Sequence, residues 1–130
     1  MKFLRIKETC LYVTDLVAAR TFYHEKLGLE VINYQPEKHL FLRAGDSVLL
    51  LFNPEDSKNK TSPPPHYAKG KQHFAFEVET DRYTEAREKI EALGISVIDE
   101  VTWKSGKMSF YFNDPEGNIL EILPESGIWD

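Results

Sequence analysis

The sequence predicts an α+β protein made of two tandem β-α-β-β-β modules. The first observation is an internal repeat, because the pattern of residues 8–15 returns in residues 73–81. The second is that each copy opens with the alternation typical of a strand and continues with a helical pattern. The third is that two further strand patterns, arranged as a hairpin, close each copy. The fold is therefore expected to consist of one motif used twice.

A helix is expected in each module, over residues 15–28 and residues 81–94. In both ranges the apolar side chains recur at helical spacing and form one stripe. Each range begins with an aspartate, which suits an N-cap because its carboxylate accepts hydrogen bonds from the first free amides. Each range ends with a glycine, which suits the position after the last turn because it tolerates a positive φ. The predicted caps are Asp15 and Asp81 at the starts and Gly28 and Gly94 at the ends.

A strand is expected directly after each helix, over residues 29–32 and residues 95–98. The last strands of the two modules are expected over residues 45–51 and residues 117–123, each beginning with a glycine. The segment 113–118 precedes the second of these, and its Asn, Asp, Pro and Gly residues predict a turn.

The chain of 130 residues is expected to form a single domain. Module one covers about residues 4–53 and module two about residues 72–124. The segment between them, about residues 54–71, is polar and proline-rich and is longer than most loops in compact domains. A solvated linker explains this composition, and a lid whose lysines attract an acidic ligand is the alternative.

Composition excludes several classes of function. The net charge of −5 and the lack of a basic stripe argue against a nucleic-acid partner. No apolar run approaches the ~18–20 residues of a membrane span, and the first residues do not resemble a signal peptide. We therefore expect no membrane partner. A single cysteine, Cys10, cannot form an internal disulfide, so we expect a cytoplasmic protein.

The repeat predicts four equivalent inward positions, because matching strands of the two modules should converge. The opening strands contribute Glu8 and His73, and the closing strands contribute Leu49 and Glu121. Glu121 lies in a segment that is apolar on both faces, where an uncompensated charge would cost several kcal/mol. This carboxylate must therefore be paired, protonated or bound to a metal.

Glu8, His73 and Glu121 together supply one nitrogen and two oxygen ligands for a divalent ion such as Mn²⁺, Fe²⁺, Ni²⁺, Co²⁺, Zn²⁺ or Mg²⁺. Leu49 cannot ligate, so positions would stay open for water or substrate, as in catalytic sites. Taken singly, each residue has an ordinary explanation: Glu8 as an exposed strand residue, His73 as a hydrogen-bonded histidine, and Glu121 as the partner of a lysine or arginine. Their joint occurrence at equivalent positions favours the metal site.

Four segments of the chain form a recognisable set. They are Glu8-Thr-Cys-Leu-Tyr-Val-Thr-Asp-Leu, Phe22-Tyr-His-Glu-Lys-Leu-Gly-Leu, Gln72-His-Phe-Ala-Phe-Glu-Val and Ser109-Phe-Tyr-Phe-Asn-Asp-Pro-Glu-Gly-Asn-Ile-Leu-Glu. Together they resemble the vicinal oxygen chelate superfamily, which includes glyoxalase I, extradiol dioxygenases, fosfomycin-resistance transferases, methylmalonyl-CoA epimerase and bleomycin-binding proteins. The resemblance covers nearly the whole chain and is specific for the superfamily rather than for one member.

The resemblance implies a glyoxalase-like fold, in which the two modules form a cupped mixed sheet around a divalent metal held by Glu8, His73 and Glu121. It implies a homodimer and a lyase, isomerase or dioxygenase whose small substrate chelates the metal through vicinal oxygens. Two departures narrow the choice. Leu49 stands where glyoxalase I has a fourth ligand that also moves protons, and Glu8 stands where dioxygenases and fosfomycin transferases usually have histidine.

Further side chains are candidates for catalysis and substrate binding. Glu77 shares the predicted face of His73 and is the best substitute base, and Tyr111 is the other catalytic candidate. Tyr12 is a candidate substrate contact, although packing would also explain either tyrosine. Trp103 resembles a pocket wall beside a positive group, Lys104, but the two also fit a surface strand. Ser109 would line the substrate, as would Ser105 and Tyr111 in the less favoured fosfomycin-type transferase.

Of the three histidines outside the predicted ligand set, only one has a candidate role. His66 follows three prolines and could fold over the metal, whereas His24 and His39 are assigned no role. The alternative to an enzyme is a metal-free binding protein of the bleomycin-resistance type, which sequesters a planar cationic drug between two subunits. The net charge and the aromatic residues near the end of the chain agree with it, but the intact ligand set favours the enzyme.

Overall fold

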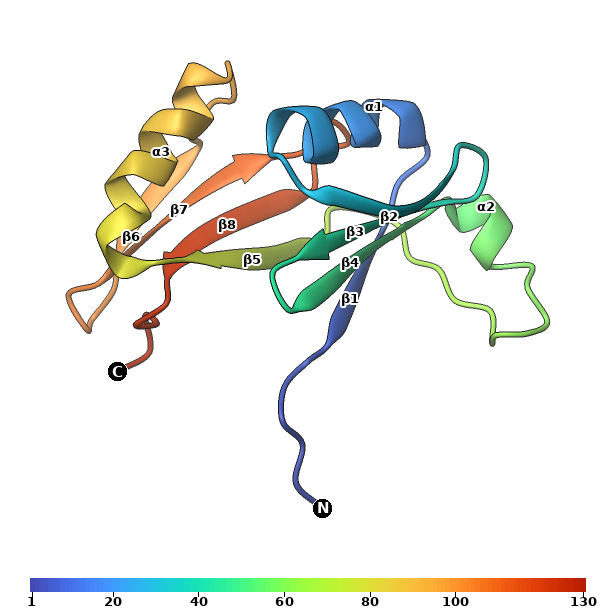
Figure 1. The fold of residues 1–130 in the computed structure, drawn as a ribbon, viewed down its shortest axis with the longest axis horizontal. Coiled ribbons are helices and arrows are strands. Elements are labelled where there is room, and N and C mark those ends of the chain that lie inside the picture. Colours follow the sequence, from blue (N-terminus) through green and yellow to red (C-terminus); the bar gives the residue numbers. More distant parts are fainter. The chain divides into compact units, whose positions relative to one another are not determined.

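Two four-stranded mixed sheets carry the fold, one in each of two compact units (Figure 1). The computed structural model describes residues 1–130, and the units are Met1–Gly70 and Lys71–Asp130. In each unit the first strand is parallel to the last strand, and the other neighbours are antiparallel. The predicted α+β class and the repeated β-α-β-β-β order are confirmed.

The first unit has the sheet order β1-β4-β3-β2. Gly45, with φ of +57°, begins the tight turn that joins β3 to β4. A helical segment, α-helical at first and then a π-helical turn, connects β1 to β2 and packs against β3. The elements are β1 (Glu8–Tyr12), α1 (Leu16–Arg20), η1 (Thr21–Lys26), β2 (Glu30–Gln35), β3 (His39–Ala44), β4 (Ser47–Phe52) and α2 (Pro54–Ser57).

The core of the first unit lies between the helical segment and one face of its sheet. Leucines that alternate along β3 and β4 are buried on this face, and Tyr23 of η1 is also fully buried. The buried leucines are Leu40, Leu42, Leu49 and Leu51. The residues between them, such as Phe41 and Leu50, therefore point to the opposite face of the sheet.

The second unit repeats this arrangement with the sheet order β5-β8-β7-β6. Helix α3 packs against β8. The core of the second unit contains Phe110, Phe112, Leu120, Ile122 and Ile90. The elements are β5 (His73–Val78), η2 (Thr80–Arg82), α3 (Tyr83–Ala92), β6 (Asp99–Thr102), β7 (Met108–Asn113) and β8 (Ile119–Pro124).

Two local predictions in the second unit were wrong. Asp81 is not an N-cap, because it lies inside the 3₁₀ turn η2 that leads into α3, and α3 begins without a side-chain cap. Residues 95–98 are not a strand. The amides of Gly94 and Ile95 bond back to Glu91 O and Ile90 O, which forms a Schellman motif and delays the strand to Asp99.

The segment between the modules contains a helix that the sequence analysis did not predict. Asn53 caps α2 by accepting a hydrogen bond from Glu55 N at 3.0 Å, and Pro54 occupies the first turn. Both residues are favourable at a helix start, so the signal was present in the sequence. Its carboxylates pair with the lysines that follow it, Glu55 with Lys58 and Asp56 with Lys60.

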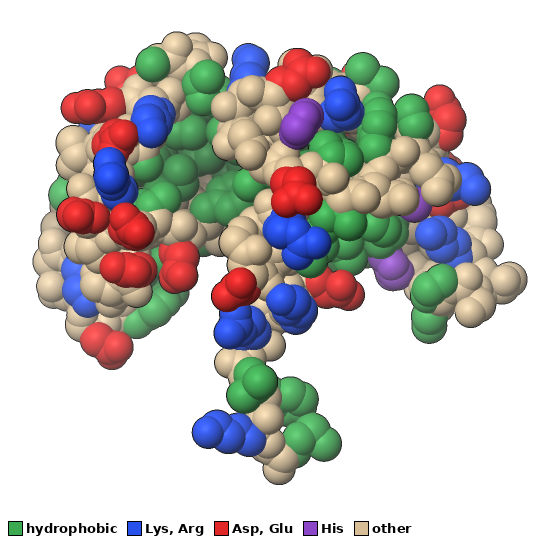
Figure 2. All heavy atoms as spheres, viewed as in Figure 1, with side chains coloured by type: hydrophobic (Ala, Val, Ile, Leu, Met, Phe, Trp, Pro, Cys, Tyr) green, Lys and Arg blue, Asp and Glu red, His purple; other side chains and the backbone are tan.

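The residues before β1 extend from the first unit as an arm (Figure 1). Its apolar side chains, Met1, Phe3, Leu4 and Ile6, are exposed, and Figure 2 shows hydrophobic and basic side chains together on this arm. The structure has no helix with the length and apolar character that a membrane span requires.

Asp15→Ala should lower the free energy of unfolding by about 1 kcal/mol, because Asp15 Oδ1 accepts the Ala18 amide at 2.9 Å. Asp81→Ala is the matched control and should change it by less than about 0.5 kcal/mol, since Asp81 caps no helix. Urea denaturation of both variants measures the difference. Equal losses in the two variants would contradict the assigned caps.

Candidate functional site

A hydrogen-bonded turn sets the position of the predicted site residues in the second unit. Asp114 Oδ1 accepts the amides of Glu116 and Asn118, and Asp114 Oδ2 accepts Asn118 Nδ2, each at 2.9 Å. Asn118 Oδ1 in turn accepts the amide of Gln72 at 3.0 Å. Because Asp114 and Asn118 are buried, this clamp fixes the start of β5 beside the start of β8. The predicted turn at residues 113–118 is confirmed.

His73 and Glu121 meet beside this clamp. His73 Nε2 lies 3.2 Å from Glu121 Oε2, and His73 Nδ1 lies 2.8 Å from the carbonyl oxygen of Ile119. A carbonyl only accepts hydrogen bonds, so Nδ1 carries a proton and donates it. His73 Nε2 then faces the carboxylate either with its lone pair or with a second proton. Two acceptors at this distance require a cation between them, which is either that proton or a metal ion.

Glu121 is deeply buried and only partly compensated. Its side chain is 7% exposed, and its Oε1 atom is buried and has no hydrogen-bond partner in the structure. The His73 side chain is 50% exposed, so the pair is reachable from solvent on one side. A buried carboxylate oxygen without a partner is costly. One more positive or donating group would therefore stabilise this carboxylate.

Tyr111 lies opposite Glu121 in the register of β7 and β8, and its ring centroid is 6.1 Å from that of His73. Burial, followed by the charge of Glu121 and a hydrogen bond with its carboxylate, raises the pKa of Tyr111, and a hydrogen bond with Ser109 opposes this change. The structure thus brings together Tyr111, His73 and Glu121, which the sequence analysis had selected separately.

The other candidates of the second unit lie around β7. Ser109 is fully buried and accepts a hydrogen bond from Trp103 Nε1 at 2.9 Å, so its hydroxyl holds Trp103 instead of facing solvent. Trp103 also contacts Trp129, with ring centroids 6.0 Å apart. Lys104 is exposed in the turn before β7. Ser105 donates to the Ile128 carbonyl and has a structural role.

Glu77 and Glu8 are exposed strand residues, unlike the paired and buried Glu121. Glu77 is exposed on β5, on the same side of the strand as His73. Glu8 is the exposed first residue of β1 and belongs to the first unit. Neither unit by itself gathers three His, Cys, Asp or Glu side chains that could hold a metal. The three-ligand set therefore remains a prediction.

Strand register corrects one equivalence between the modules. In the first unit Cys10 is paired with Leu50, and in the second Ala75 is paired with Glu121. Leu50 is therefore the counterpart of Glu121, and the assignment of Leu49 was wrong. The two last strands were aligned in sequence on Gly45 and Gly117. This alignment was one residue off because β4 follows a tight turn, whereas β8 follows the longer Asp114–Asn118 clamp. Leucine cannot ligate a metal at either position, so the expected open coordination is unaffected.

The first unit contains its own pocket, of about 760 Å³, on the sheet face opposite the core. Aromatic side chains form much of its lining, and the loop that follows α2 also contributes to it. Figure 2 shows histidine, basic and hydrophobic side chains side by side near α2. The lining residues are Glu8, Thr9, Cys10, Tyr12, His39, Phe41, Leu50, Phe52, Lys60, Pro63 and His66.

Tyr12 and His66 are paired within this pocket. Tyr12 Oη lies 2.5 Å from His66 Nδ1 and 3.6 Å from Cys10 Sγ. Burial, followed by the contact with Cys10, raises the pKa of Tyr12 to about 12. Its hydroxyl is therefore protonated at neutral pH and serves as a hydrogen-bond donor. His66 also packs edge-on against Phe52, with ring centroids 4.7 Å apart.

His39 is a pocket residue that the sequence analysis left without a role. Its ring stacks on Phe41, with centroids 4.1 Å apart, and its Nε2 lies 2.6 Å from Asn33 Oδ1. Its Nδ1 atom is buried and has no hydrogen-bond partner. Alternation along residues 39–44 was the available signal, because it places His39 and Phe41 on one face and the buried leucines on the other.

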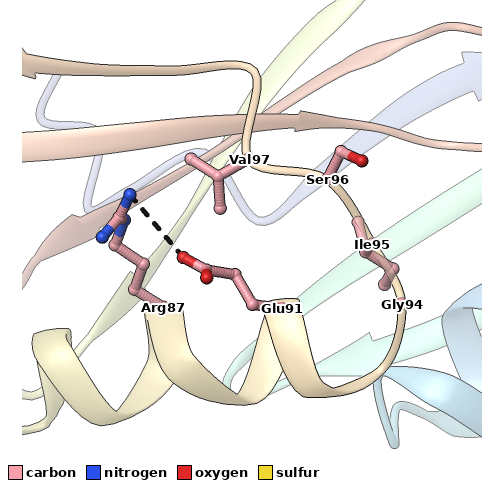
Figure 3. A pocket seen from close by; sticks show the side chains of 6 residues that line it. All are labelled: Arg87, Glu91, Gly94, Ile95, Ser96 and Val97. Atoms are coloured by element: carbon pink, nitrogen blue, oxygen red, sulfur yellow. Dashed lines mark ion pairs between the residues drawn. The ribbon is translucent and has the colours of Figure 1, made fainter.

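A second hollow, of about 460 Å³, lies in the second unit at the end of α3 (Figure 3). Figure 3 shows Arg87 and Glu91 turned toward each other, and their closest charged atoms are 3.6 Å apart. Arg87 Nε also lies 3.4 Å from Glu100. Two carboxylates already neutralise the arginine, so we assign this hollow no function.

The His39 imidazole should titrate below its ordinary pKa of 6.5, because burial and the Lys60 charge both disfavour protonation. The stability that neutral His39 provides is therefore present above the unfolded pKa and is lost as the pH falls through the lower folded pKa. Lys60→Gln should raise the His39 pKa, whereas Lys58→Gln, whose lysine pairs with Glu55, should not. NMR titration of the imidazole signals measures both, and an unchanged midpoint in Lys60→Gln would contradict the prediction.

Comparison with known proteins agrees with the fold. Residues 5–122 match the sequence profile of the Glyoxalase/Bleomycin resistance protein/Dioxygenase superfamily. Glutathione transferase FosA of Serratia marcescens is 31% identical over 115 residues, which are 86% of this chain and 74% of the relative. Virulence protein STM3117 of Salmonella typhimurium is 28% identical over 122 residues, or 91% of this chain and 82% of the relative.

A solved structure described as lactoylglutathione lyase from Agrobacterium tumefaciens superposes with a TM-score of 0.89. It is 36% identical in sequence, and the match covers 96% of both chains. The predicted glyoxalase-like fold is thereby confirmed. The chain belongs to the Glyoxalase/Bleomycin resistance protein/Dioxygenase superfamily.

Proposed function

We propose that this protein is a metal-dependent enzyme, a lyase, isomerase or dioxygenase, acting on a small substrate that chelates a divalent ion through vicinal oxygens. The observation that carries the proposal is the pair of His73 Nε2 and Glu121 Oε2, 3.2 Å apart, with a buried and unbonded Glu121 Oε1. A divalent ion bound to both side chains would neutralise the buried carboxylate.

The donor set fits a divalent ion. Histidines that bind metals usually donate their other ring N–H to a carbonyl or carboxylate, and His73 donates to the Ile119 carbonyl. Glu121 adds a carboxylate that is short of partners, and we propose Glu8 as the third ligand. When bound, an ion such as Mn²⁺, Fe²⁺, Ni²⁺, Co²⁺, Zn²⁺ or Mg²⁺ would act as a Lewis acid toward substrate oxygens.

The remaining residues would bind substrate and move protons. Tyr111, beside Glu121, would donate a hydrogen bond to a substrate oxygen. Glu77, exposed on the His73 side of β5, would serve as the base. Trp103, held by Ser109, would form a wall, and Lys104 would supply positive charge.

Two other functions stay open as candidates. The 31% identity to glutathione transferase FosA supports group transfer on the same superfamily site. The aromatic pocket of the first unit supports metal-free binding of a drug or metabolite, with Tyr12 among its contacts. The 36% identity and 0.89 TM-score to lactoylglutathione lyase instead support lyase chemistry, which we favour.

Purified protein should contain divalent metal near one equivalent per chain, as measured by elemental analysis. His73→Ala and Glu121→Gln should weaken metal binding at least tenfold, roughly the size of effect that even supporting residues have on metal affinity. Glu8→Gln tests the third ligand in the same assay. Glu79→Gln changes an exposed carboxylate that follows β5 and pairs with Arg82, so this variant is the control and should retain the metal.

Wild-type protein that neither contains nor takes up metal would overturn the enzyme proposal and favour the binding protein. Circular dichroism of each variant shows whether a loss of metal reflects a loss of fold. Retention of full metal by Glu121→Gln would remove the buried carboxylate from the ligand set.

Product analysis separates the lyase from the transferase. With methylglyoxal and glutathione, NMR should detect S-lactoylglutathione if the lyase assignment holds. With fosfomycin and glutathione, a covalent thiol adduct found by mass spectrometry would favour the transferase. Formation of the adduct without lactoylglutathione would contradict the preferred function.

We also propose that the protein is a cytoplasmic homodimer. β1 and β2 lie at the edges of their sheet, as do β5 and β6, and exposed edges favour association. The exposed apolar side chains of the arm add surface that a second subunit could cover. The single cysteine agrees with a reducing compartment. Sedimentation equilibrium tests the dimer, and a monomer would contradict it.

A further inference from the structure

The pocket of the first unit has two chemically different ends. Strand register places Tyr12 beside Phe52, and Phe52 beside His39, at one end of the sheet. Glu8 lies beside Val48 at the other end of β1. Tyr12 is the fourth residue after Glu8 along the strand, a distance of about 13 Å at the usual rise of a β-strand. We call the end formed by Tyr12, His39, Phe41, Phe52, Lys60 and His66 the aromatic end.

Phe52 is the centre of the aromatic end. The ring centroids of Tyr12, Phe41 and His66 lie 6.2, 5.4 and 4.7 Å from that of Phe52. The ring of His39 continues the cluster by stacking on Phe41 at 4.1 Å. A pocket of about 760 Å³ with aromatic walls has the size and character of a small-molecule site. Such walls suit a planar ring, which gains offset or edge-to-face contacts.

One positive charge lies at this end. Lys60 Nζ is 5.6 Å from the Phe52 ring centroid, and its side chain is 28% exposed. Its nearest carboxylate oxygen, Asp56 Oδ2, is 3.8 Å away, which is beyond hydrogen-bond distance, and that oxygen has no hydrogen-bond partner. The ammonium therefore makes no hydrogen bond to Asp56. An anionic ligand group would gain a charge-assisted hydrogen bond from Lys60 in a partly desolvated setting.

His39 adds an unused acceptor to the same lining. Its Nε2 lies 2.6 Å from the Asn33 side-chain oxygen, so Nε2 carries the proton and Nδ1 carries the lone pair. Nδ1 is buried and unbonded. Because this atom is buried, a ligand hydroxyl or N–H group would bond to it only after the neighbouring side chains move.

We propose that the aromatic end binds a planar aromatic acid, with the ring against Phe52 and Phe41 and the acidic group on Lys60. A cationic aromatic ligand fits less well, because Lys60 already occupies the position over the Phe52 ring that such a cation would take. The inference goes beyond the proposed function, because it assigns this pocket a ligand of its own, distinct from the substrate that would chelate the metal. Binding itself requires only the first unit.

The test compares three probes of one shape: naphthoate, naphthalenemethanol and naphthylmethylammonium. Each is titrated by calorimetry into full-length protein stripped of metal and kept in chelator. Naphthoate should bind about tenfold more tightly than the neutral alcohol, which corresponds to one charge-assisted hydrogen bond. In Lys60→Gln this preference should disappear while the affinity for the alcohol stays the same.

Lys58→Gln is the matched control, because Lys58 lies in the same segment but pairs with Glu55 and does not line the pocket. Phe52→Leu should weaken all three probes, and circular dichroism confirms that each variant is folded. Three results would each overturn the proposal: none of the probes binds, the ammonium binds most tightly, or the preference for naphthoate persists in Lys60→Gln.

His73→Ala separates this proposal from the metal site. His73 lies in the second unit, so His73→Ala should bind naphthoate as the wild type does even where it binds no metal. A wild-type protein without metal that still prefers naphthoate would contradict the enzyme proposal alone. A protein that binds metal but no naphthoate would contradict the ligand class alone.

Discussion

A carboxylate in the middle of an apolar strand is the constraint on which the second unit depends. Glu121 lies between the buried Leu120 and Ile122, and its side chain is 7% exposed. An ionised group so placed is tolerated only with partners, because the loss of hydration costs several kcal/mol. His73 and Tyr111 lie on the two strands that flank β8, so both strand pairings must be in register for Glu121 to be compensated.

The turn before β8 provides this register. The Asp114 carboxylate accepts hydrogen bonds within the turn, and the Asn118 side-chain oxygen accepts one from the amide of Gln72, which precedes His73. The first unit has the same strand order but a tight turn at Gly45, and it has Leu50 in place of Glu121. Without a buried charge to compensate, the corresponding sheet face is free to carry an aromatic pocket. One repeated motif thus carries a buried carboxylate in the second unit and an aromatic pocket in the first.

Much of the fold was predictable because its signals are local. Alternation located most strands, the cap at Asp15 and the glycines at positive φ bounded the helices, and the repeat revealed the two modules. The failures were local signals overridden by their context. Asp81 has the chemistry of a cap but lies in a 3₁₀ turn, and Ile95 has the composition of a strand but uses its amide to end a helix.

Some residues of the candidate site could likewise be identified from local sequence, and others only from the structure. The sequence alone was sufficient to single out Glu121, because a carboxylate within an apolar run needs a partner wherever the strand packs, and the repeat was sufficient to select His73. The identity of Leu50 as the counterpart of Glu121, the unbonded Nδ1 of His39 and the position of Lys60 over Phe52 emerged only in three dimensions. These features depend on strand offsets and on the path of a loop. Such contacts join residues far apart in the chain, and no local pattern encodes them.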